Sequence, residues 1–314
     1  MVIKNSKKLA LGIDLGGTNI GAGLVDLTGK ILKKKIELTQ KELGPKKVIK
    51  RMIGMAEEIL GNQKVRGIGI GAPGPIKKGL LISPSNLAGW KKVDIITPFK
   101  KEFFCKVILD NDANAAALAE KKFGAGKGAQ NLIYLTISTG IGGGIIINGE
   151  IYKGFGNAGE LGHMIIDRDS KFRCGCGNYG CLEALASGTG IVDLFRERFK
   201  KNGELNELKE ITAKEIFRMA KKGDKVAEEV VNQALTVLGV GIVNYIHIFN
   251  PEMIVLGGSI ALKRRKLVFP FLRKFVKKMV MPAFKNNVKI VPAKLGSEAG
   301  IIGAAALAFG AADS

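Results

Sequence analysis

The stretch "LALGIDLGGTNIGAGLVDL", residues 9–27, decides how the chain begins to fold. Two apolar segments, "LALGIDL" and "IGAGLVDL", predict two buried strands, and "GGTN" predicts the turn that joins them. Because glycines lack a Cβ atom, the backbone N–H groups of such a turn can approach an anion closely, and Thr18 adds a hydroxyl. Read alone, the same turn is also consistent with an ordinary tight hairpin.

A second glycine-rich turn, "STGIGGG" at residues 138–144, follows another apolar strand and precedes a strand pair joined through "NG". Strands and helical patterns follow each turn in a similar order. We therefore predict an α/β protein made of two tandem β-β-β-α-β-α units, closed by a helix of small residues. Two matching turns across a cleft would hold a polyphosphate from both sides. Helices are expected at residues 45–60, 187–200, 212–222 and 225–249.

Two further features extend the predicted nucleotide site. Asp14 ends the first strand, where its carboxylate could reach a hydrated magnesium ion. The stretch "IVLGGS" brings Gly257 and Gly258 to the end of another buried strand, which is where α/β sheets bind ligands. These two glycines are equally consistent with a plain turn from strand to helix.

The stretch "DNDANAAA", residues 110–117, places acidic and amide side chains between a buried strand and an Ala-rich helix. Asp and Asn are preferred N-caps, so any of these side chains could simply satisfy free N–H groups at the helix start. One cap is enough, however, and the stretch offers several. An ionised carboxylate here could hold a substrate hydroxyl and accept its proton late in phosphoryl transfer. From the residues alone, both roles stay open for Asn111 and Asp112.

Three of the four cysteines and one of the two histidines lie in one loop, residues 159–183. A Cys-x-Cys pair is too short for a relaxed disulfide, a thiol nucleophile would need a base, and iron–sulfur clusters usually take four cysteines. Three thiolates and one imidazole match a closed, structural zinc site, which we favour over unligated cysteines. Such a site would also fix Glu160 and Glu183, whose carboxylates suit recognition of a polyol. The four expected ligands are His163, Cys174, Cys176 and Cys181.

The chain of 314 residues has ordinary globular composition, with 46% hydrophobic and 25% charged residues. Its 49 basic and 28 acidic residues give a net charge of +21, which could attract nucleic acid. The lysines are scattered in pairs without interleaved aromatic residues, which favours a solvated surface that attracts anions in general. No apolar run suggests a membrane span and no signal peptide is recognised. We therefore expect a cytoplasmic protein that binds neither nucleic acid nor membranes.

Five motifs together resemble the ROK family of sugar kinases and sugar-responsive repressors, and within it the bacterial and archaeal glucokinases. The resemblance covers nearly the whole chain, and the cysteine motif is its most specific part. The motifs are "LGIDLGGTNIGAGLVDLTGK" at residues 11–30, "GIGAPGP" at 69–75, "NDANAA" at 111–116, "STGIGGGIIINGEIYKGFGNAGELGHM" at 138–164 and "CGCGNYGCLEALASG" at 174–188.

The resemblance implies an actin-like ATPase (ribonuclease H-like) fold, with sugar and Mg–ATP in a cleft between two domains. Residues 1–112 and a C-terminal helix at 298–314 would form the smaller domain, and residues 113–297 the larger one, which carries the zinc loop. Asp112 would be the catalytic base that takes the proton from the 6-hydroxyl of glucose. Sugar contacts would come from Asn86, Asn111, Asp112, Glu160, His163 and Glu183, with His163 serving both zinc and sugar. Phosphate, magnesium and nucleoside contacts would come from Asp14, Gly16, Gly17, Thr18, Asn19, Thr139, Gly140, Gly257 and Gly258.

The resemblance also implies the partners, which are ATP and a hexose, with glucose favoured, in a homodimer or homotetramer. The alternatives are a kinase for N-acetylglucosamine, N-acetylmannosamine, fructose or allose, a donor such as ADP or polyphosphate, a silent sugar sensor and a transcriptional repressor. The retained Asp112 argues against a silent sensor. We expect no repressor, because the thirteen residues before Asp14 are too few for a DNA-binding domain.

Overall fold

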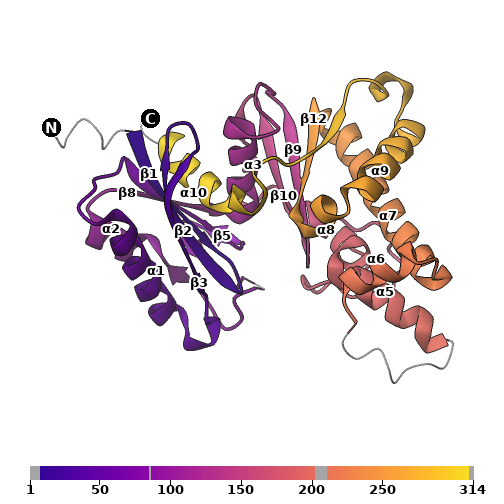
Figure 1. The fold of residues 1–314 in the computed structure, drawn as a ribbon, viewed down its shortest axis with the longest axis horizontal. Helices are drawn as coiled ribbons and strands as arrows, with labels where there is room; N and C mark the ends of the chain where they lie inside the picture. The colour runs from indigo at the N-terminus through magenta and orange to yellow at the C-terminus, as the bar shows by residue number, and fades with distance from the viewer. Residues whose placement is uncertain (1–7, 85, 202–210, 311–314) are drawn as a thin grey trace. The chain divides into compact units, whose positions relative to one another are not determined.

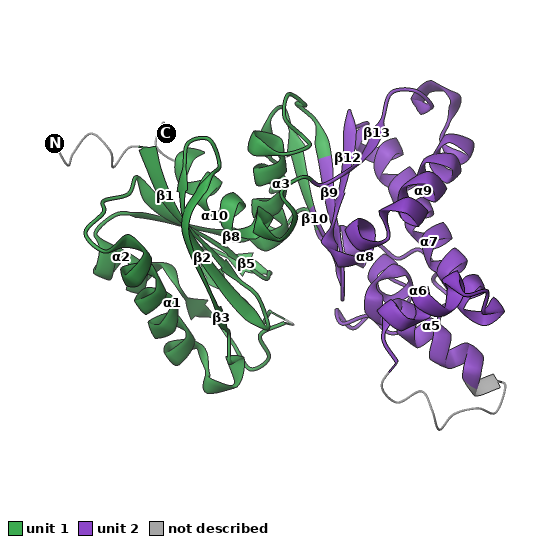
Figure 2. Cartoon of the chain, viewed as in Figure 1, with its two compact units in different colours: residues 1–132, 144–159, 294–314 green, residues 133–143, 160–293 purple. Residues whose placement is uncertain are grey.

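The computed structural model describes residues 8–84, 86–201 and 211–310 (Figure 1). Both strands and helices occur throughout this part of the chain, as predicted for an α/β protein. The chain divides into two compact units (Figure 2). It contains two five-stranded sheets. The predicted domain division at residues 112 and 298 stays a prediction. Unit 1 comprises Met1–Leu132, Gly144–Gly159 and Lys294–Ser314, and unit 2 comprises Ile133–Gly143 and Glu160–Ala293.

The sheet of unit 1 has the strand order β3-β2-β1-β4-β8. The first three strands form an antiparallel meander, and β4 and β8 run parallel to β1. Because Asp14 pairs with Gly71 and Gly71 pairs with Asp110, these residues lie in one row near the carboxyl ends of the parallel strands. The strands are β1 (Leu9–Leu15), β2 (Asn19–Asp26), β3 (Ile31–Leu38), β4 (Gly67–Ala72) and β8 (Lys106–Asn111).

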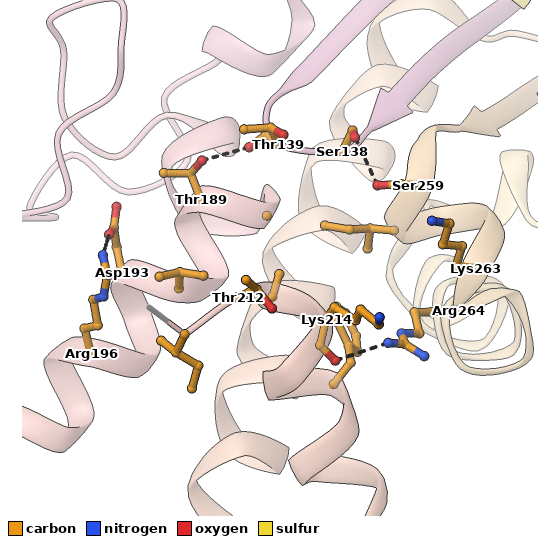
Figure 3. Close-up of a pocket in the computed structure, with 16 residues that line it drawn as sticks. Ser138, Thr139, Thr189, Asp193, Arg196, Thr212, Lys214, Ser259, Lys263 and Arg264 are labelled. Carbon is orange, nitrogen blue, oxygen red and sulfur yellow. Dashed lines mark hydrogen bonds and ion pairs between the residues drawn. The ribbon is translucent and has the colours of Figure 1, made fainter. Parts of the chain in front are cut away.

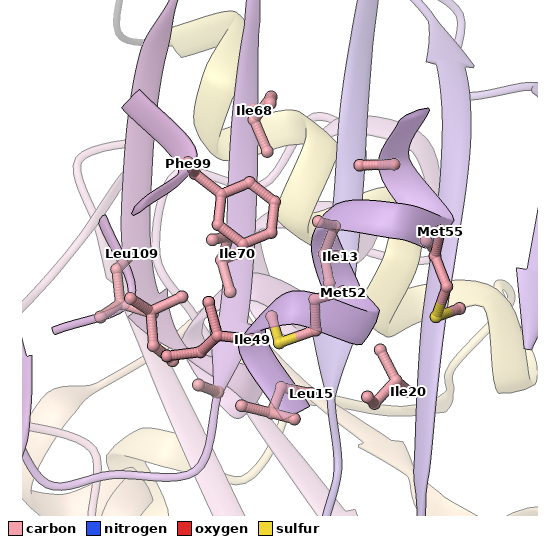
Figure 4. Packing of buried hydrophobic residues seen from close by; sticks show 14 of the residues in the cluster. Ile13, Leu15, Ile20, Ile49, Met52, Met55, Ile68, Ile70, Phe99 and Leu109 are labelled. Carbon is pink, nitrogen blue, oxygen red and sulfur yellow. The ribbon is translucent and has the colours of Figure 1, made fainter. Parts of the chain in front are cut away.

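Alternate residues of β1 face opposite sides of this sheet. Leu11, Ile13 and Leu15 belong to the large core that α1 (Pro45–Leu60) covers, as Figure 4 shows in part. Ala10 belongs instead to a core cluster formed with α10 (Ala299–Gly310). The apolar side chains of α1 recur every three or four residues, and burial of each large one contributes about 1.5–3 kcal/mol. Those buried in α1 are Val48, Ile49, Met52, Met55, Ala56, Ile59 and Leu60.

Helix α10 packs very close to the backbone of unit 1. A Cβ atom built at Gly12 would lie 2.0 Å from the carbonyl oxygen of Ile301, and one at Gly69 would lie 1.7 Å from that of Ala304. The helix also contacts α3 (Asp112–Phe123), where a Cβ at Gly303 would lie 2.0 Å from a backbone oxygen. Only glycine permits these approaches, which explains the small residues that the sequence places here.

The second sheet has the order β11-β10-β9-β12-β13, which repeats the order of the first sheet. Strand β11 and most of β10 belong to unit 1. The boundary between the units runs through β9 and β10. Strand β10 already begins at Ile141, so the second glycine turn is shorter than predicted and "GGG" lies within the strand. The predicted "NG" hairpin is confirmed, since Asn148 and Gly149 both have positive φ (53° and 83°). The strands are β9 (Leu132–Ile137), β10 (Ile141–Ile147), β11 (Glu150–Ile151), β12 (Met253–Gly257) and β13 (Lys289–Pro292).

The helices of unit 2 include the three that were predicted. The longest, α7, is apolar and long enough to cross a membrane, but 56% of its most apolar window is buried and it packs against α4, α5, α6 and α9. This is the behaviour of a core helix. Helices α4, α8 and α9 were not predicted from the sequence. The bounds are α4 (Leu182–Ala186), α5 (Gly188–Lys201), α6 (Ala213–Lys221), α7 (Lys225–Phe249), α8 (Gly258–Lys263) and α9 (Arg265–Met279).

Unit 1 contains further short elements that the sequence did not reveal. They lie between β4 and β8 and comprise a short helix and a small antiparallel sheet, β5-β6-β7. Two-residue strands have no detectable periodicity, which is why pattern reading missed them. These elements are β5 (Ile76–Lys77), β6 (Leu80–Leu81), β7 (Val93–Asp94) and α2 (Ile96–Phe103).

Candidate active site and metal centre

At the start of α3, one residue caps the helix and a different residue is the predicted catalytic residue. The side-chain oxygen of Asn111 accepts hydrogen bonds from the N–H groups of Ala113 (2.8 Å) and Asn114 (3.3 Å). Asn111 is therefore the N-cap, and Asp112 is the first helical residue, with Oδ1 2.8 Å from the N–H of Ala113. Since the cap is already supplied, Asp112 is available for another role.

The neighbouring Asp110 is held firmly in place. It is buried, forms an ion pair with Lys153 (2.6 Å) and accepts a hydrogen bond from the side chain of Asn114 (3.1 Å). Its charge is thus compensated within unit 1. The pair fixes the end of β8, which in turn fixes the backbone on which Asn111 and Asp112 stand. Nothing in the local sequence identified Lys153, which lies 43 residues further along the chain.

Two carboxylates of unit 1 lie close enough to influence each other. Burial raises the pKa of Asp14 to about 7, and the charge of Asp112 contributes to the rise. Burial also raises the pKa of Asp112, although the N–H of Ala113 opposes the shift. Two poorly hydrated carboxylates of this kind are stabilised by a cation between or beside them. The donor set therefore fits a magnesium ion, with Asp14 as the residue that would hold it, directly or through water.

The first glycine turn is supported from behind by Thr39. Thr39 is buried. Its hydroxyl donates to the carbonyl of Gly16 (2.7 Å), and its backbone N–H donates to the carbonyl of Thr18 (2.8 Å). A Cβ atom at Gly17 would lie 2.8 Å from the backbone oxygen of Asn86, so glycine lets that segment lie against the turn. Asn86 is thus brought beside the predicted phosphate turn. Thr18 and Asn19 are exposed at its tip.

The second turn lies in unit 2 and is attached to Glu183. The N–H of Ile141 donates to Oε2 of Glu183 (2.8 Å), and a Cβ at Gly140 would lie 2.4 Å from the same oxygen. The start of α5 also holds this turn, since Thr189 donates through its N–H and its hydroxyl to the carbonyl of Thr139 (both 3.1 Å). Glu183 therefore lies against the turn, and its predicted contact with sugar stays a prediction.

The third glycine pair forms a strand-to-helix turn, and the residues that follow it line a pocket. Gly258 has a φ of 84° and begins α8, and a Cβ there would lie 2.3 Å from the carbonyl oxygen of Ile137. The adjacent Ser259 hydroxyl lies 3.0 Å from that of Ser138 (Figure 3). This arrangement brings the second turn and the third glycine pair together in unit 2.

A pocket of about 440 Å³ opens beside these two turns, a size that suits a small organic ligand (Figure 3). Phe217 lines the pocket, and the guanidinium of Arg264 lies over its ring at 5.4 Å from the ring centroid. Arg264 also donates to the carbonyl of Lys214 (3.2 Å), which joins α6 to the start of α9. The lining residues are Ser138, Thr139, Gly188, Thr189, Val192, Asp193, Arg196, Ile211, Thr212, Ala213, Lys214, Phe217, Ser259, Ile260, Lys263 and Arg264.

The predicted zinc ligands come together in unit 2. The candidate ligand atoms of His163, Cys174, Cys176 and Cys181 all lie within 4.8 Å of one another. The sulfur atoms of Cys176 and Cys181 are 3.7 Å apart, close to the edge of about 3.8 Å expected for a tetrahedral zinc with Zn–S bonds of about 2.3 Å. Burial raises the pKa of the Cys174 and Cys181 thiols, so thiolates at these positions require a compensating cation. The residues fit a zinc ion.

The two ring nitrogens of His163 face different neighbours. Nδ1 lies 3.3 Å from the Cys174 sulfur, within the cysteine cluster, while Nε2 lies 3.8 Å from a carboxylate oxygen of Glu160. One nitrogen can therefore bind a metal while the other points toward the predicted sugar residue. The predicted sugar contacts come from both units: Asn86, Asn111 and Asp112 from unit 1, and Glu160, His163 and Glu183 from unit 2.

Comparison with known proteins places the chain in a family. The ROK family model matches residues 10–311. A glucokinase of Thermotoga maritima is 38% identical over 306 residues, which cover 95% of this chain and 96% of that protein. The crystal structure of a ROK family glucokinase from Streptomyces griseus, in complex with glucose and AMPPNP, is 30% identical, has a TM-score of 0.79 and covers 95% of this chain and 98% of that one. A xylose repressor of Bacillus spizizenii is 33% identical over 96% of this chain and 78% of its own length. The likeness confirms the predicted actin-like ATPase fold, and the chain belongs to the ROK family.

Proposed function

We propose that this protein is a glucokinase that transfers the γ-phosphate of ATP to the 6-hydroxyl of glucose. The glucokinase from Thermotoga maritima and the glucose- and AMPPNP-bound relative support this choice of donor and acceptor. The observation that supports the proposal in this chain is that Asn111, and not Asp112, caps α3. Asn111 caps the helix, so Asp112 is left as a carboxylate beside Asp14 rather than as a structural cap.

Asp112 is the proposed catalytic base. It would accept a hydrogen bond from the 6-hydroxyl of the sugar and take its proton as the phosphoryl group is transferred, a role in which position matters more than strong basicity. Its raised pKa makes it a somewhat stronger base than an exposed aspartate. Asp14 would hold the magnesium ion of Mg–ATP, which neutralises charge on the phosphates when bound.

The pocket of unit 2 is the proposed nucleoside site. It adjoins Thr139 and the glycine pair, so a base and ribose in the pocket would lead directly to phosphates at the turn. Its apolar walls, which include Phe217 and Ile260, suit a planar base and give polyphosphate no comparable contact. ATP is therefore favoured over polyphosphate as the donor.

The cysteine cluster is proposed to hold a structural zinc ion that orients the sugar residues. With Nδ1 of His163 on the metal, Nε2 is left as a donor to a sugar hydroxyl, next to Glu160.

We also expect the domain division at residues 112 and 298, a homodimer or homotetramer, and a cytosolic location. Sedimentation of the purified protein checks the assembly.

The test is a panel of hexoses and N-acetylhexosamines with ATP, ADP and polyphosphate as donors, assayed with magnesium. We expect glucose and ATP to give the highest kcat/KM. Asp112→Ala should lose turnover yet still bind glucose by calorimetry. Asp169→Ala serves as the matched control, since the Asp169 side chain is 83% exposed. Unchanged turnover in Asp112→Ala would remove the base assignment.

A second candidate is a sugar sensor without catalysis, because a xylose repressor also shares the family. The same panel separates the two functions. A sensor would bind a sugar with measurable affinity and show no phosphoryl transfer with any donor. Turnover that depends on Asp112 would exclude it.

A further inference from the structure

Gly300, the second residue of α10, lies directly against the side chain of Asp14. A Cβ atom built at Gly300 would lie 2.1 Å from Oδ2, 2.5 Å from Cγ and 3.1 Å from Oδ1 of Asp14, and these are its three nearest atoms. Separations under 3.0 Å are essentially never found for a real Cβ. The space that any other residue would need at this position is therefore occupied by one carboxyl group.

The backbone does not explain this glycine. Gly300 lies in a helix and has no positive φ, so alanine could adopt its conformation and would normally be preferred there by about 1 kcal/mol. The closeness follows instead from the packing of unit 1. Gly12 and Gly69 let α10 lie against β1 and β4, and Asp14 shares the face of β1 that Gly12 turns toward the helix. The carboxylate of Asp14 thus meets the first turn of α10.

We propose that Gly300 is a positioning residue of the active site, because its missing side chain leaves the room in which the Asp14 carboxylate lies. A carboxylate at a helix start is favoured by the partial positive charge there. The proposal rests on the proposed function only in assuming that Asp14 holds the magnesium ion of Mg–ATP. The steric relation between the two residues does not depend on that function.

The test is a double-mutant cycle of Gly300→Ala in two backgrounds, wild type and Asp14→Ala, with melting temperature and kinase activity as readouts. In the wild-type background the new methyl must displace the carboxylate by about 1 Å, and such a displacement costs on the order of 10²-fold in kcat/KM. We also expect the melting temperature to fall by a few degrees. In the Asp14→Ala background the obstructing group is gone, so Gly300→Ala should cause no further loss of activity and no fall in melting temperature.

Gly54→Ala is the matched control, since a Cβ at this position on α1 would meet no atom within 4 Å. It should keep wild-type activity and melt no lower than the wild type. The proposal is overturned if Gly300→Ala keeps more than a third of the wild-type kcat/KM, or if it lowers the melting temperature equally in both backgrounds. If Gly300→Ala fails to fold, recovery of folding in the double variant supports the proposal, and failure of both variants to fold overturns it. The melting-temperature arm needs no substrate, so it decides the steric claim even if the enzyme acts on another sugar.

Discussion

Replacing Asp14 with Asn should stabilise the metal-free protein at alkaline pH while removing its kinase activity. In the folded protein the pKa of Asp14 is raised to about 7, mainly by burial, with the charge of Asp112 adding to the effect. The ionised carboxylate is therefore less favourable in the folded state than in the unfolded chain. Asn has nearly the same shape and no charge, so it removes that cost.

The size of the effect follows from the two pKa values. The rise from 3.8 to about 7 is roughly 3 units, or about 4 kcal/mol at pH 8 at 1.36 kcal/mol per unit. Because the folded state binds the proton more tightly, the stability that Asp14 contributes is fully present below pH 3.8 and is lost as the pH rises toward 7. Asp14→Asn should not show this loss.

Urea unfolding of the wild type and of Asp14→Asn at pH 5 and pH 8, in magnesium-free buffer, measures this difference. The single tryptophan, Trp90, is buried in the core of unit 1, so its fluorescence reports the unit that contains Asp14. The free energy of unfolding of Asp14→Asn should exceed that of the wild type by an amount that grows by about 2–3 kcal/mol from pH 5 to pH 8. A gap that is the same at both pH values would refute the reasoning. Added magnesium should stabilise the wild type more than the variant.

Three further predictions concern the rest of the site. Asp112→Asn should lower kcat by about 10²–10⁴-fold, which is the usual range for loss of a general base. Its affinity for glucose, measured by calorimetry, should stay within a few fold of the wild-type value. An equally large loss of affinity would indicate that Asp112 binds the sugar rather than acting as the base. Elemental analysis should find one zinc per chain. A strong chelator should lower the melting temperature measured by circular dichroism. The unfolding transition measured by Trp90 fluorescence should stay unchanged, because the predicted ligands lie in unit 2. Full activity without zinc would contradict the orienting role. Phe217→Ala should raise KM for ATP several-fold and leave KM for glucose unchanged, because Phe217 lines the pocket of unit 2; a change confined to glucose would contradict the nucleoside assignment.

The parts of the fold that follow from periodic patterns could be predicted from the sequence. The apolar runs around the two glycine turns gave the first strands of both sheets, and helical spacing gave α1, α5, α6 and α7 close to their observed bounds. The strands β5, β6 and β7 are too short to carry a period. Helix α9 was missed because its apolar residues are mixed with lysines and arginines, and Pro270 lies inside it.

The candidate site was predictable where one motif contains its own partners. The four predicted zinc ligands lie within 19 residues of one another, and the structure confirms that their candidate ligand atoms come together. The supporting residues come from distant segments, and their role depends on tertiary contacts. Thr39 and Lys153 carry no signal near the motifs that they support. Gly300 likewise looks like one more small residue in an Ala-rich helix until Asp14 is placed beside it.

Glu183 connects the predicted metal site to the predicted phosphate turn, which gives a physical reason for the two motifs to occur together. Its backbone follows Cys181 in α4, so a metal on the cysteines fixes where the helix begins. Its carboxylate accepts the N–H of Ile141 (2.8 Å), immediately after the turn. Gly140 must lack a Cβ for this carboxylate to fit, since a Cβ would lie 2.4 Å from Oε2. A metal on the cysteines would thereby be coupled to the turn through one side chain, so we expect zinc occupancy to affect binding of the phosphate donor as well as the residues expected to hold the sugar.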